Sequence, residues 1–306
     1  KALVYDSFVT MVLKEVQEKT GLDPYNDGLT IETTIDSKAQ QRLFDILNTN
    51  DYIQYVNDKI QNAVVMLDTK TGAVRAVNGG RKQTTLLGYN RVTDNSRSTG
   101  STIKPVIDYG PAIEYLNYST GQTIMDKRTT YSNGVELNNW DFSHKGAMTL
   151  RTALVYSRNT TALQTFKAVG ETNIKSFLNN LDIQIKNDGQ DYLVESNSIG
   201  ADISPIKMAA AYAAFGNYGT YSKPYTVTKV TTRDGQVTEF KPEQKQAMKD
   251  STAYMITDVL KDSFKYGFAT QASIPGLPTA AKTGSSNYTV EQKRAMGASD
   301  YEDIIP

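Results

Sequence analysis

Three short combinations of serine, lysine and asparagine in this sequence could carry out nucleophilic chemistry at a carbonyl carbon. Ser101 and Lys104 form an S-x-x-K pair, in which the lysine lies one helical turn from the serine hydroxyl. Ser157 and Asn159 form an S-x-N pair, and Lys282 opens a K-T-G triplet. A serine becomes a nucleophile when a base takes its proton, and a neutral lysine amine can be that base. These residue types therefore predict acyl transfer through an acyl-enzyme.

Each combination also occurs a second time, so the copies have to be separated by their context. Ser204 and Lys207 form another S-x-x-K pair, but Ser204 followed by Pro205 is typical of a helix start. The K-T-G at 70–72 lies between two β-rich runs and is predicted to be a hairpin turn. The S-x-N at 285–287 overlaps the end of the chain's second K-T-G region and comes last. Only the first set has the order S-x-x-K, S-x-N, K-T-G, which is far more specific than any of its parts.

The composition excludes several other kinds of active site. The chain has no cysteine, which rules out thiolate nucleophiles, disulfides and Cys-ligated metals. Its one histidine, His144, lies in a polar stretch and is interpreted as an ordinary loop residue, so we expect no metal site and no Ser-His-Asp triad. Lys plus Arg and Asp plus Glu both count 33, which disfavours a nucleic-acid partner. No apolar run is long enough to span a bilayer.

The periodicity of apolar residues predicts the elements that position these side chains. Helices are expected over 3–19, 37–47, 101–116, 149–156, 159–168, 172–181, 204–215 and 250–265. Strands are expected over 29–35, 63–69, 73–78 and 280–285, with a further hairpin over 225–240. Strands near both ends with a helical middle predict an α/β (α+β) fold, in which helices cover an antiparallel sheet built from the terminal strands. Residues 1–60 are predicted to be an accessory region and 61–306 the main domain.

Ser101 and Lys104 are predicted to begin a helix. Pro105 fits best in a first helical turn, where its missing N–H would bond nothing. A serine at this end of a helix lies in a positive potential that favours a developing alkoxide. Lys104 has to be neutral to act as a base, and burial together with a second cation would lower its pKa. Lys282 is the expected second cation.

The remaining residues of the set are expected to bind the substrate and move its protons. Ser157 would relay a proton between the lysines and the leaving group, and Asn159 would hydrogen-bond the substrate amide, although a helix cap explains both equally well. Thr283, with the lysine before it, would bind a substrate carboxylate. Gly284 would let the substrate backbone lie against this edge. The backbone N–H groups of Ser285 and of the nucleophilic serine would form the oxyanion hole.

At these residues the sequence resembles the class A penicillin-binding proteins, most closely the 1a type of Gram-positive cocci. The resemblance extends over roughly 60–290 and covers more than the three motifs. It is carried by 62–68 with 79–80, 89–91 leading into 100–105, 208–219 and 281–288. Residues 1–60 resemble the linker that joins such a transpeptidase to an N-terminal glycosyltransferase, a domain that we do not expect in this chain.

The resemblance implies a D,D-transpeptidase with the penicillin-binding, serine β-lactamase-like fold. Ser101 would attack the D-Ala-D-Ala bond of a peptidoglycan stem peptide, D-Ala would leave, and an amine from a neighbouring strand would resolve the acyl-enzyme. β-Lactams would acylate the same serine and leave slowly. The family needs no metal or cofactor and works at the extracytoplasmic face of the bacterial plasma membrane. We expect this domain to be held at the membrane only by an anchor that lies outside this chain.

Two features depart from the family pattern. Arg158, the middle residue of S-x-N, occupies a variable position, so we expect it to matter little. In the family, two strands and a helix follow the K-T-G strand and complete the sheet, whereas residues 285–306 are mostly polar and contain no strand pair. The domain is therefore predicted to be C-terminally incomplete, either because a second chain supplies the missing strands or because they were removed.

Two other functions remain open on sequence grounds. A D,D-carboxypeptidase or a β-lactamase would use the same serine with water as the acceptor. A class A β-lactamase needs a carboxylate to activate that water, and nothing between Ser157 and Lys282 marks one among the several acidic residues there. A β-lactam sensor would be acylated without turnover, but it would have no need of a linker such as 1–60.

Overall fold

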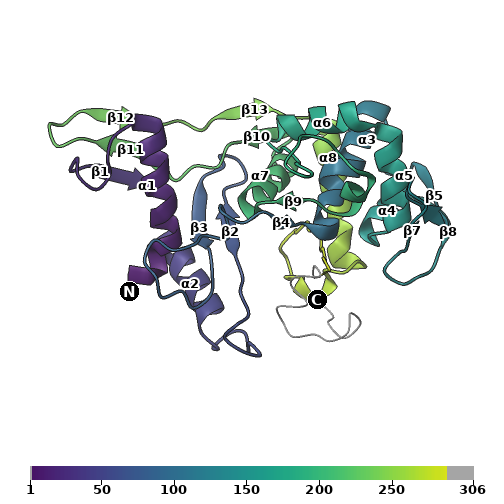
Figure 1. The fold of residues 1–306 in the computed structure, drawn as a ribbon, viewed down its shortest axis with the longest axis horizontal. Coiled ribbons are helices and arrows are strands. Elements are labelled where there is room, and N and C mark those ends of the chain that lie inside the picture. Colours follow the sequence, from purple (N-terminus) through teal and green to yellow (C-terminus); the bar gives the residue numbers. More distant parts are fainter. Residues whose placement is uncertain (1, 288–306) are drawn as a thin grey trace. The chain divides into compact units, whose positions relative to one another are not determined.

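The computed structural model of the protein describes residues 2–287. These residues form two compact units, and the chain passes from one to the other and back (Figure 1). The first unit contains residues up to Ser96 and returns over 203–247. The second contains 97–202 and continues from Met248. Each unit is described by itself.

The first unit combines small antiparallel sheets with three α-helices. Strands β1, β11 and β12 form one sheet in that order, β2 pairs with β3 as a hairpin, and β10 pairs with β13. The elements are a 3-10 turn at Ala2–Tyr5, α1 Asp6–Thr20, β1 Thr30–Thr33, α2 Ser37–Asn48, β2 Val64–Leu67, β3 Val74–Asn78, α7 Pro205–Gly216, β10 Thr220–Ser222, β11 Val227–Thr231, β12 Val237–Glu239 and β13 Gln244–Gln246.

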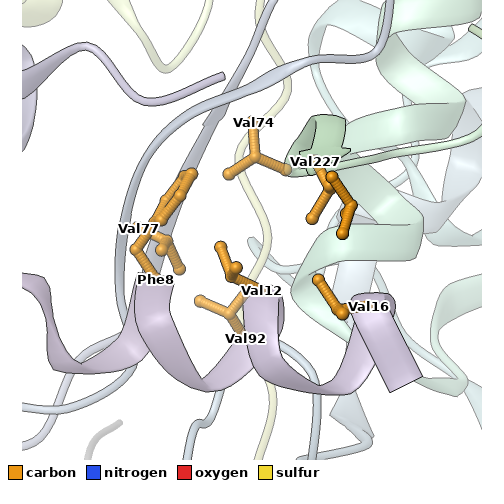
Figure 2. Close-up of a cluster of buried hydrophobic side chains, with 8 residues drawn as sticks. Phe8, Val12, Val16, Val74, Val77, Val92 and Val227 are labelled. Atoms are coloured by element: carbon orange, nitrogen blue, oxygen red, sulfur yellow. The ribbon is translucent and has the colours of Figure 1, made fainter. Parts of the chain in front are cut away.

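The core of this unit forms where one face of α1 packs on two strand pairs. Phe8, Val12 and Val16 recur every four residues, so they lie on one face of the helix and are buried together. Figure 2 shows them facing Val74 and Val77 of β3. Val92, Val227 and Val230 complete the cluster. Residues before and after position 60 therefore share one core, and the domain boundary predicted there stays a prediction.

Two local predictions are confirmed in this unit, for the K-T-G copy at 70–72 and for the S-x-x-K pair that begins at Ser204. In addition, the carboxylate of Asp36 accepts hydrogen bonds from two N–H groups of the first turn of α2 and so caps this helix. The K-T-G copy at 70–72 is the turn between β2 and β3, and its glycine has φ of +79°. Helix α7 begins at Pro205 directly after Ser204, which identifies the second S-x-x-K pair as a helix start.

The second unit is mostly helical, with short strand pairs at its edge. Helices α3, α5 and α6 contact the helical segment 105–109, and α8 contacts α3 and α4. The elements are β4 Arg97–Ser98, a 3-10 turn at Gly100–Ile103, a π-helical turn at Pro105–Tyr109, α3 Gly110–Leu116, β5 Thr123–Asp126, β6 Thr129–Thr130, β7 Glu136–Leu137, β8 Gly146–Thr149, α4 Leu150–Val155, α5 Asn159–Val169, α6 Glu171–Asn180, a 3-10 turn at Glu195–Ile199, β9 Asp202–Ile203, α8 Asp250–Lys265 and a 3-10 turn at Thr270–Ala272.

The helix predicted over 101–116 is helical throughout but changes its winding twice. The N–H of Lys104 donates to the carbonyl of Ser101, three residues back, and the N–H of Gly110 donates to the carbonyl of Pro105, five residues back. Pro105 and Pro111 have no N–H, so the regular ladder of four-residue bonds cannot form across them. Within 101–116, regular α-helix is therefore confined to α3, Gly110–Leu116.

One strand prediction fails in the second unit, and two strand pairs there were not predicted. The structure assigns no strand to 280–285, because a strand exists only as part of a ladder and no described segment pairs with these residues. Conversely, the hairpin-like pairs β5 with β8 and β6 with β7 were not predicted. Their strands are only two to four residues long, too short for an alternating pattern to stand out. The mixed helical and antiparallel architecture confirms the predicted fold class.

None of the helices within 2–287 is long and apolar enough to cross a bilayer. In the same part of the chain, no group of three or more His, Asp or Glu side chains could hold a metal ion.

Candidate active site

A cleft of about 680 Å³ opens on the second unit, and most of the predicted site residues line it. Ser101 enters it from the 3-10 turn, and Ser157 with Asn159 enters from the junction between α4 and α5. A third wall is the extended segment 283–287. The lining is completed by Ser98, Gly100, Asn138, Asn139, Trp140, Phe142, Ser196, Ile199, Gly200 and Phe268. Three stretches that are remote in sequence therefore meet at one surface.

The two lysines converge on one serine hydroxyl. Lys104 is fully buried, and its Nζ lies 3.2 Å from Ser157 Oγ, 2.8 Å from the Ser157 carbonyl oxygen and 2.7 Å from Asn159 Oδ1. Lys282 Nζ lies 2.9 Å from the same Oγ and 2.8 Å from the carbonyl oxygen of Thr283. Ser157 Oγ thus bridges two amines, an arrangement through which a proton can pass from one to the other.

The environment of both amines favours their neutral forms. Burial, and then the charge of Lys282, lowers the pKa of Lys104 well below its ordinary value, while the charge of Asp108 opposes this shift. Burial also lowers the pKa of Lys282, to about 8. The lysine one turn after Ser101 is therefore held in the state that a general base requires.

Ser157 has an unusual backbone conformation. It lies between α4, which ends at Val155, and α5, which begins at Asn159, with Arg158 as the residue before the helix. Its φ is +52°, in the left-handed region that residues other than glycine rarely adopt. Such strain costs roughly 1–3 kcal/mol and is found mainly where the surroundings hold it for a functional reason. The Ser157 N–H donates to the Leu154 carbonyl oxygen at 3.1 Å and the Arg158 N–H to the Ala153 carbonyl oxygen at 3.0 Å, the bonding pattern of a left-handed helix C-cap. The backbone of Ser157 therefore does end α4, as the helix-cap alternative expected, while its hydroxyl lies between the two lysine amines.

Two glycines allow the predicted oxyanion segments to touch. Gly100 has φ of +51°, and a Cβ added there would overlap the carbonyl oxygen of Ser285. A Cβ on Gly284 would come within 2.7 Å of the Thr99 carbonyl oxygen and 2.8 Å of the Thr102 nitrogen. The sequence interpretation gave Gly284 the task of admitting substrate. In the structure, the protein's own backbone already requires the glycine.

Arg158 corrects a second sequence expectation. Its side chain was expected to matter little, yet it is only 2% exposed. The guanidinium bonds to the carboxylates of Asp126 and Asp141 and to the carbonyl oxygen of Ser143. No local pattern marks an arginine that will be buried, because its acidic partners lie on other elements. The sequence therefore carried no signal for it.

Asp108 is a second residue that sequence reasoning missed. It lies one turn after Lys104, is fully buried, and neither carboxyl oxygen has a hydrogen-bond partner among the described residues. Burial raises the pKa of this carboxyl well above its usual range. An unsatisfied buried polar group costs about 1–3 kcal/mol, so the carboxyl of Asp108 lowers the folding stability of the protein.

We expect Asp108→Ala to raise the free energy of unfolding by roughly 1 kcal/mol, because it removes this unsatisfied group. Asp126→Ala is the matched control, since Asp126 is equally buried but accepts four hydrogen bonds. Its loss is expected to cost about 3–5 kcal/mol. Urea unfolding followed by circular dichroism measures both. A destabilised Asp108→Ala protein would show that the carboxyl has a partner.

The fold and the site together define a serine acyl-transfer domain, and comparison with known proteins identifies its family. Residues 62–301 match the penicillin binding protein transpeptidase domain. Because this match covers most of the chain, the chain belongs to that family.

The most similar curated relatives are class A penicillin-binding proteins. Penicillin-binding protein 1A/1B of Bacillus subtilis (strain 168) is 42% identical over 289 residues, which cover 93% of this chain and 31% of that protein. Penicillin-binding protein 1A of Streptococcus oralis is 40% identical over 295 residues, which cover 94% and 46%. The chain thus spans less than half the length of these relatives. The resemblance found in the sequence is confirmed.

Solved structures confirm the predicted fold. The penicillin-binding protein PonA1 of Mycobacterium tuberculosis superposes with a TM-score of 0.77 at 22% identity, covering 94% of this chain and 77% of that one. The same protein in complex with penicillin V gives a TM-score of 0.78 at 23% identity, with the same coverage. At these identities the likeness concerns the fold, which is the penicillin-binding, serine β-lactamase-like fold.

Proposed function

We propose that this chain is the D,D-transpeptidase part of a peptidoglycan synthase, with Ser101 as the acylated nucleophile. The observation that carries the proposal is the pair of lysine amines on Ser157 Oγ, at 3.2 Å from Lys104 and 2.9 Å from Lys282, beside the cleft that Ser101 lines. Family membership and the names of the relatives support it.

Acylation would use the neutral amine of Lys104 as the base. Lys104 takes the proton of Ser101 while Oγ attacks the carbonyl carbon of the penultimate D-Ala, or of a β-lactam ring. The negative charge that develops on the carbonyl oxygen would be met by the N–H groups of Ser101 and Ser285. As the C–N bond breaks, the proton passes from the Lys104 ammonium through Ser157 Oγ to the leaving nitrogen. Charge and protons then balance, and the lysine is neutral again.

The second half of the reaction would run the same path in reverse. An amine from a neighbouring stem peptide binds where D-Ala left, loses a proton through Ser157 to Lys104, and attacks the acyl-enzyme ester. Ser101 Oγ leaves and recovers its proton. Asn159 would orient the donor amide, because its Nδ2 and Oδ1 are held by the Asn138 carbonyl oxygen and by Lys104.

Binding of the substrate carboxylate is assigned to Lys282 and Thr283, and this predicts a pH dependence. The pKa of Lys282 is about 8, so the ammonium is present below that pH and lost above it. Affinity of the Ser101→Ala protein for a penicillin carboxylate is therefore expected to be constant at low pH and to fall roughly tenfold per pH unit above the pKa. Equilibrium titrations across this range measure it.

The control for this prediction is Lys282→Arg, whose guanidinium stays charged. It is expected to bind with little change up to about pH 10. Both proteins carry Ser101→Ala. If the protein that keeps Lys282 binds penicillin with an affinity that stays flat across the pKa of Lys282, or if the arginine variant loses affinity in parallel, Lys282 does not bind the carboxylate.

The test of the proposed function is a fluorescent penicillin label followed by a chase. We expect stoichiometric label, located on the peptide that contains Ser101 and retained for hours. Rapid loss of label would indicate a β-lactamase. Long-lived label without exchange of a D-amino acid into a stem peptide would indicate a sensor, and release of D-Ala to water alone would indicate a carboxypeptidase. An unlabelled protein would contradict all four functions.

The setting of the enzyme is part of the same proposal. The chain would act at the extracytoplasmic face of the plasma membrane on peptidoglycan stem peptides, with β-lactams as inhibitors and no nucleic-acid partner. Residues 1–60 would be the linker of such a protein.

A further inference from the structure

The guanidinium of Arg158 lies in a closed set of acceptors inside the second unit. Its Nε is 2.9 Å from Asp126 Oδ2, its Nη1 is 3.0 Å from Asp141 Oδ2, and its Nη2 is 2.6 Å from the Ser143 carbonyl oxygen. The side chain of Asp126 is fully buried, whereas that of Asp141 is 19% exposed. A planar guanidinium with three differently placed acceptors has one orientation, so this end of the side chain is anchored.

Asp126 joins this ion pair to the start of α5. Its Oδ1 accepts hydrogen bonds from Thr160 Oγ1 at 2.6 Å and from Asn139 Nδ2 at 2.8 Å, and its Oδ2 also accepts from the Lys145 N–H at 2.9 Å. The other end of the Asn139 amide accepts from the N–H groups of Asn159 and Thr160. Every bond in this group is made between buried or half-buried atoms, where hydrogen bonds are strongest.

The same network reaches the catalytic lysine. Asn139 Oδ1 holds the Asn159 N–H at 2.8 Å, and the Asn138 carbonyl oxygen accepts from Asn159 Nδ2 at 2.8 Å. The amide of Asn159 therefore has one orientation, with Oδ1 turned toward Lys104 Nζ at 2.7 Å. Four hydrogen bonds, through three intervening residues, thus connect the Arg158 guanidinium to the general base.

Arg158 also follows the strained residue of the site. Ser157 has φ of +52°, and a strained backbone persists only where its neighbours prevent relaxation. Two main-chain bonds to the end of α4 close the turn here: the Ser157 N–H donates to the Leu154 carbonyl oxygen at 3.1 Å, and the Arg158 N–H to the Ala153 carbonyl oxygen at 3.0 Å. The second bond requires the main chain of Arg158 to stay in place, and its buried side chain anchors this residue. If Ser157 relaxed to an ordinary conformation, its Oγ would leave the position between the two lysine amines.

We propose that Arg158, paired with Asp126, is a positioning residue for acylation: its anchored side chain keeps in place the main chain that closes the turn at Ser157 and, through Asp126 and Asn139, orients Asn159 toward Lys104. Arg158 touches neither the substrate nor the reacting atoms. The inference rests on the proposed function, because it assigns Arg158 a task in acylation by Ser101.

The experiment compares acylation of wild type and Arg158→Gln by penicillin in stopped-flow, with the active fraction titrated first. The acylation rate constant of the active fraction is expected to fall about 10²-fold, the usual effect of misplacing a catalytic group by about 1 Å. The dissociation constant of the complex before acylation is expected to change only a few-fold. Arg158→Lys keeps the charge but cannot bond to all three acceptors. Its acylation rate constant is expected to lie between those of the wild type and Arg158→Gln.

A double variant separates positioning from a structural role. Arg158→Gln alone leaves the buried Asp126 carboxylate with three hydrogen-bond donors but without its arginine counter-ion, which is strongly destabilising. Asp126→Asn together with Arg158→Gln removes both buried charges of this pair. We expect the double variant to regain most of the lost thermal stability while its acylation rate constant stays low. If the rate constant recovered together with stability, or if it were unchanged in Arg158→Gln, the proposal would be wrong.

Arg151 provides a matched control in the same unit. It is also paired with two carboxylates, those of Asp258 and Asp262, but none of the three lines the cleft. Arg151→Gln is expected to lower stability and leave the acylation rate constant unchanged; an equal fall in both arginine variants would contradict a specific role for Arg158. Absence of label on the wild-type protein would instead contradict the proposed function, so the two failures are distinguishable.

Discussion

Ser101→Ala is expected to take up no penicillin label at any concentration or pH, whereas Ser204→Ala is expected to be labelled at the wild-type rate. The two serines differ in where they lie relative to the cleft. Ser101 lines the cleft and lies one turn before a buried lysine. Ser204 has the same local motif but precedes α7, and neither it nor Lys207 lines that cleft. Without the hydroxyl of Ser101, no acyl-enzyme ester can form.

The measurement is fluorescence in a denaturing gel, with intact-protein mass spectrometry to count the adducts. Circular dichroism of both variants shows whether each is folded. The prediction is contradicted if Ser101→Ala retains a specific, stoichiometric adduct, or if Ser204→Ala loses its label while remaining folded. Because the two serines occur in the same four-residue pattern, the comparison tests the three-dimensional site and not the motif alone.

Lys104→Met is expected to lower the acylation rate constant by about 10²- to 10⁴-fold, the range over which a positioned general base contributes. Methionine keeps much of the length and apolar body of the lysine, so the fully buried site should stay filled. The variant removes the amine on Ser157 Oγ and on Asn159 Oδ1. Folding stability is expected to change little, since a buried amine is itself costly to desolvate.

The pH profile provides the decisive readout for Lys104. In the wild type, the acylation rate constant should rise with pH until Lys104 is neutral and then level off. That rise should begin well below the ordinary range of lysine, because burial and Lys282 lower the pKa of Lys104. Lys104→Met should show a slow, nearly flat profile, and Lys207→Met should behave as wild type. A Lys104→Met protein that acylates normally would show that another group is the base.

The sequence by itself determined which residues meet at the site. Ser101 and Lys104 are linked by helical spacing, and the order of the three motifs separated them from the copies at 70–72 and at Ser204. Helix starts, hairpin turns and most helices could be predicted, because caps, prolines and apolar periodicity act within a few residues.

Only the tertiary structure decided how the site is held. The two lysine amines on Ser157 Oγ and the buried ion pair of Arg158 with Asp126 depend on atoms that other elements bring close. The same holds for the carboxyl of Asp108, which has no hydrogen-bond partner in the described part of the chain. A strand at 280–285 was predicted from its residues, yet these residues form no ladder with any part of the chain within 2–287, because strand pairing requires a neighbour that local sequence does not supply.

At Gly284, the sequence and the tertiary structure each supply part of the explanation. The K-T-G motif marked it as important, and the sequence interpretation assigned it to the substrate. In the structure a Cβ there would collide with Thr99 and Thr102, so the glycine serves the contact between two segments of the protein. Motif spacing therefore determined which chemistry this chain carries, whereas long-range packing, hydrogen bonding and burial decided the geometry and proton affinities with which that chemistry can occur.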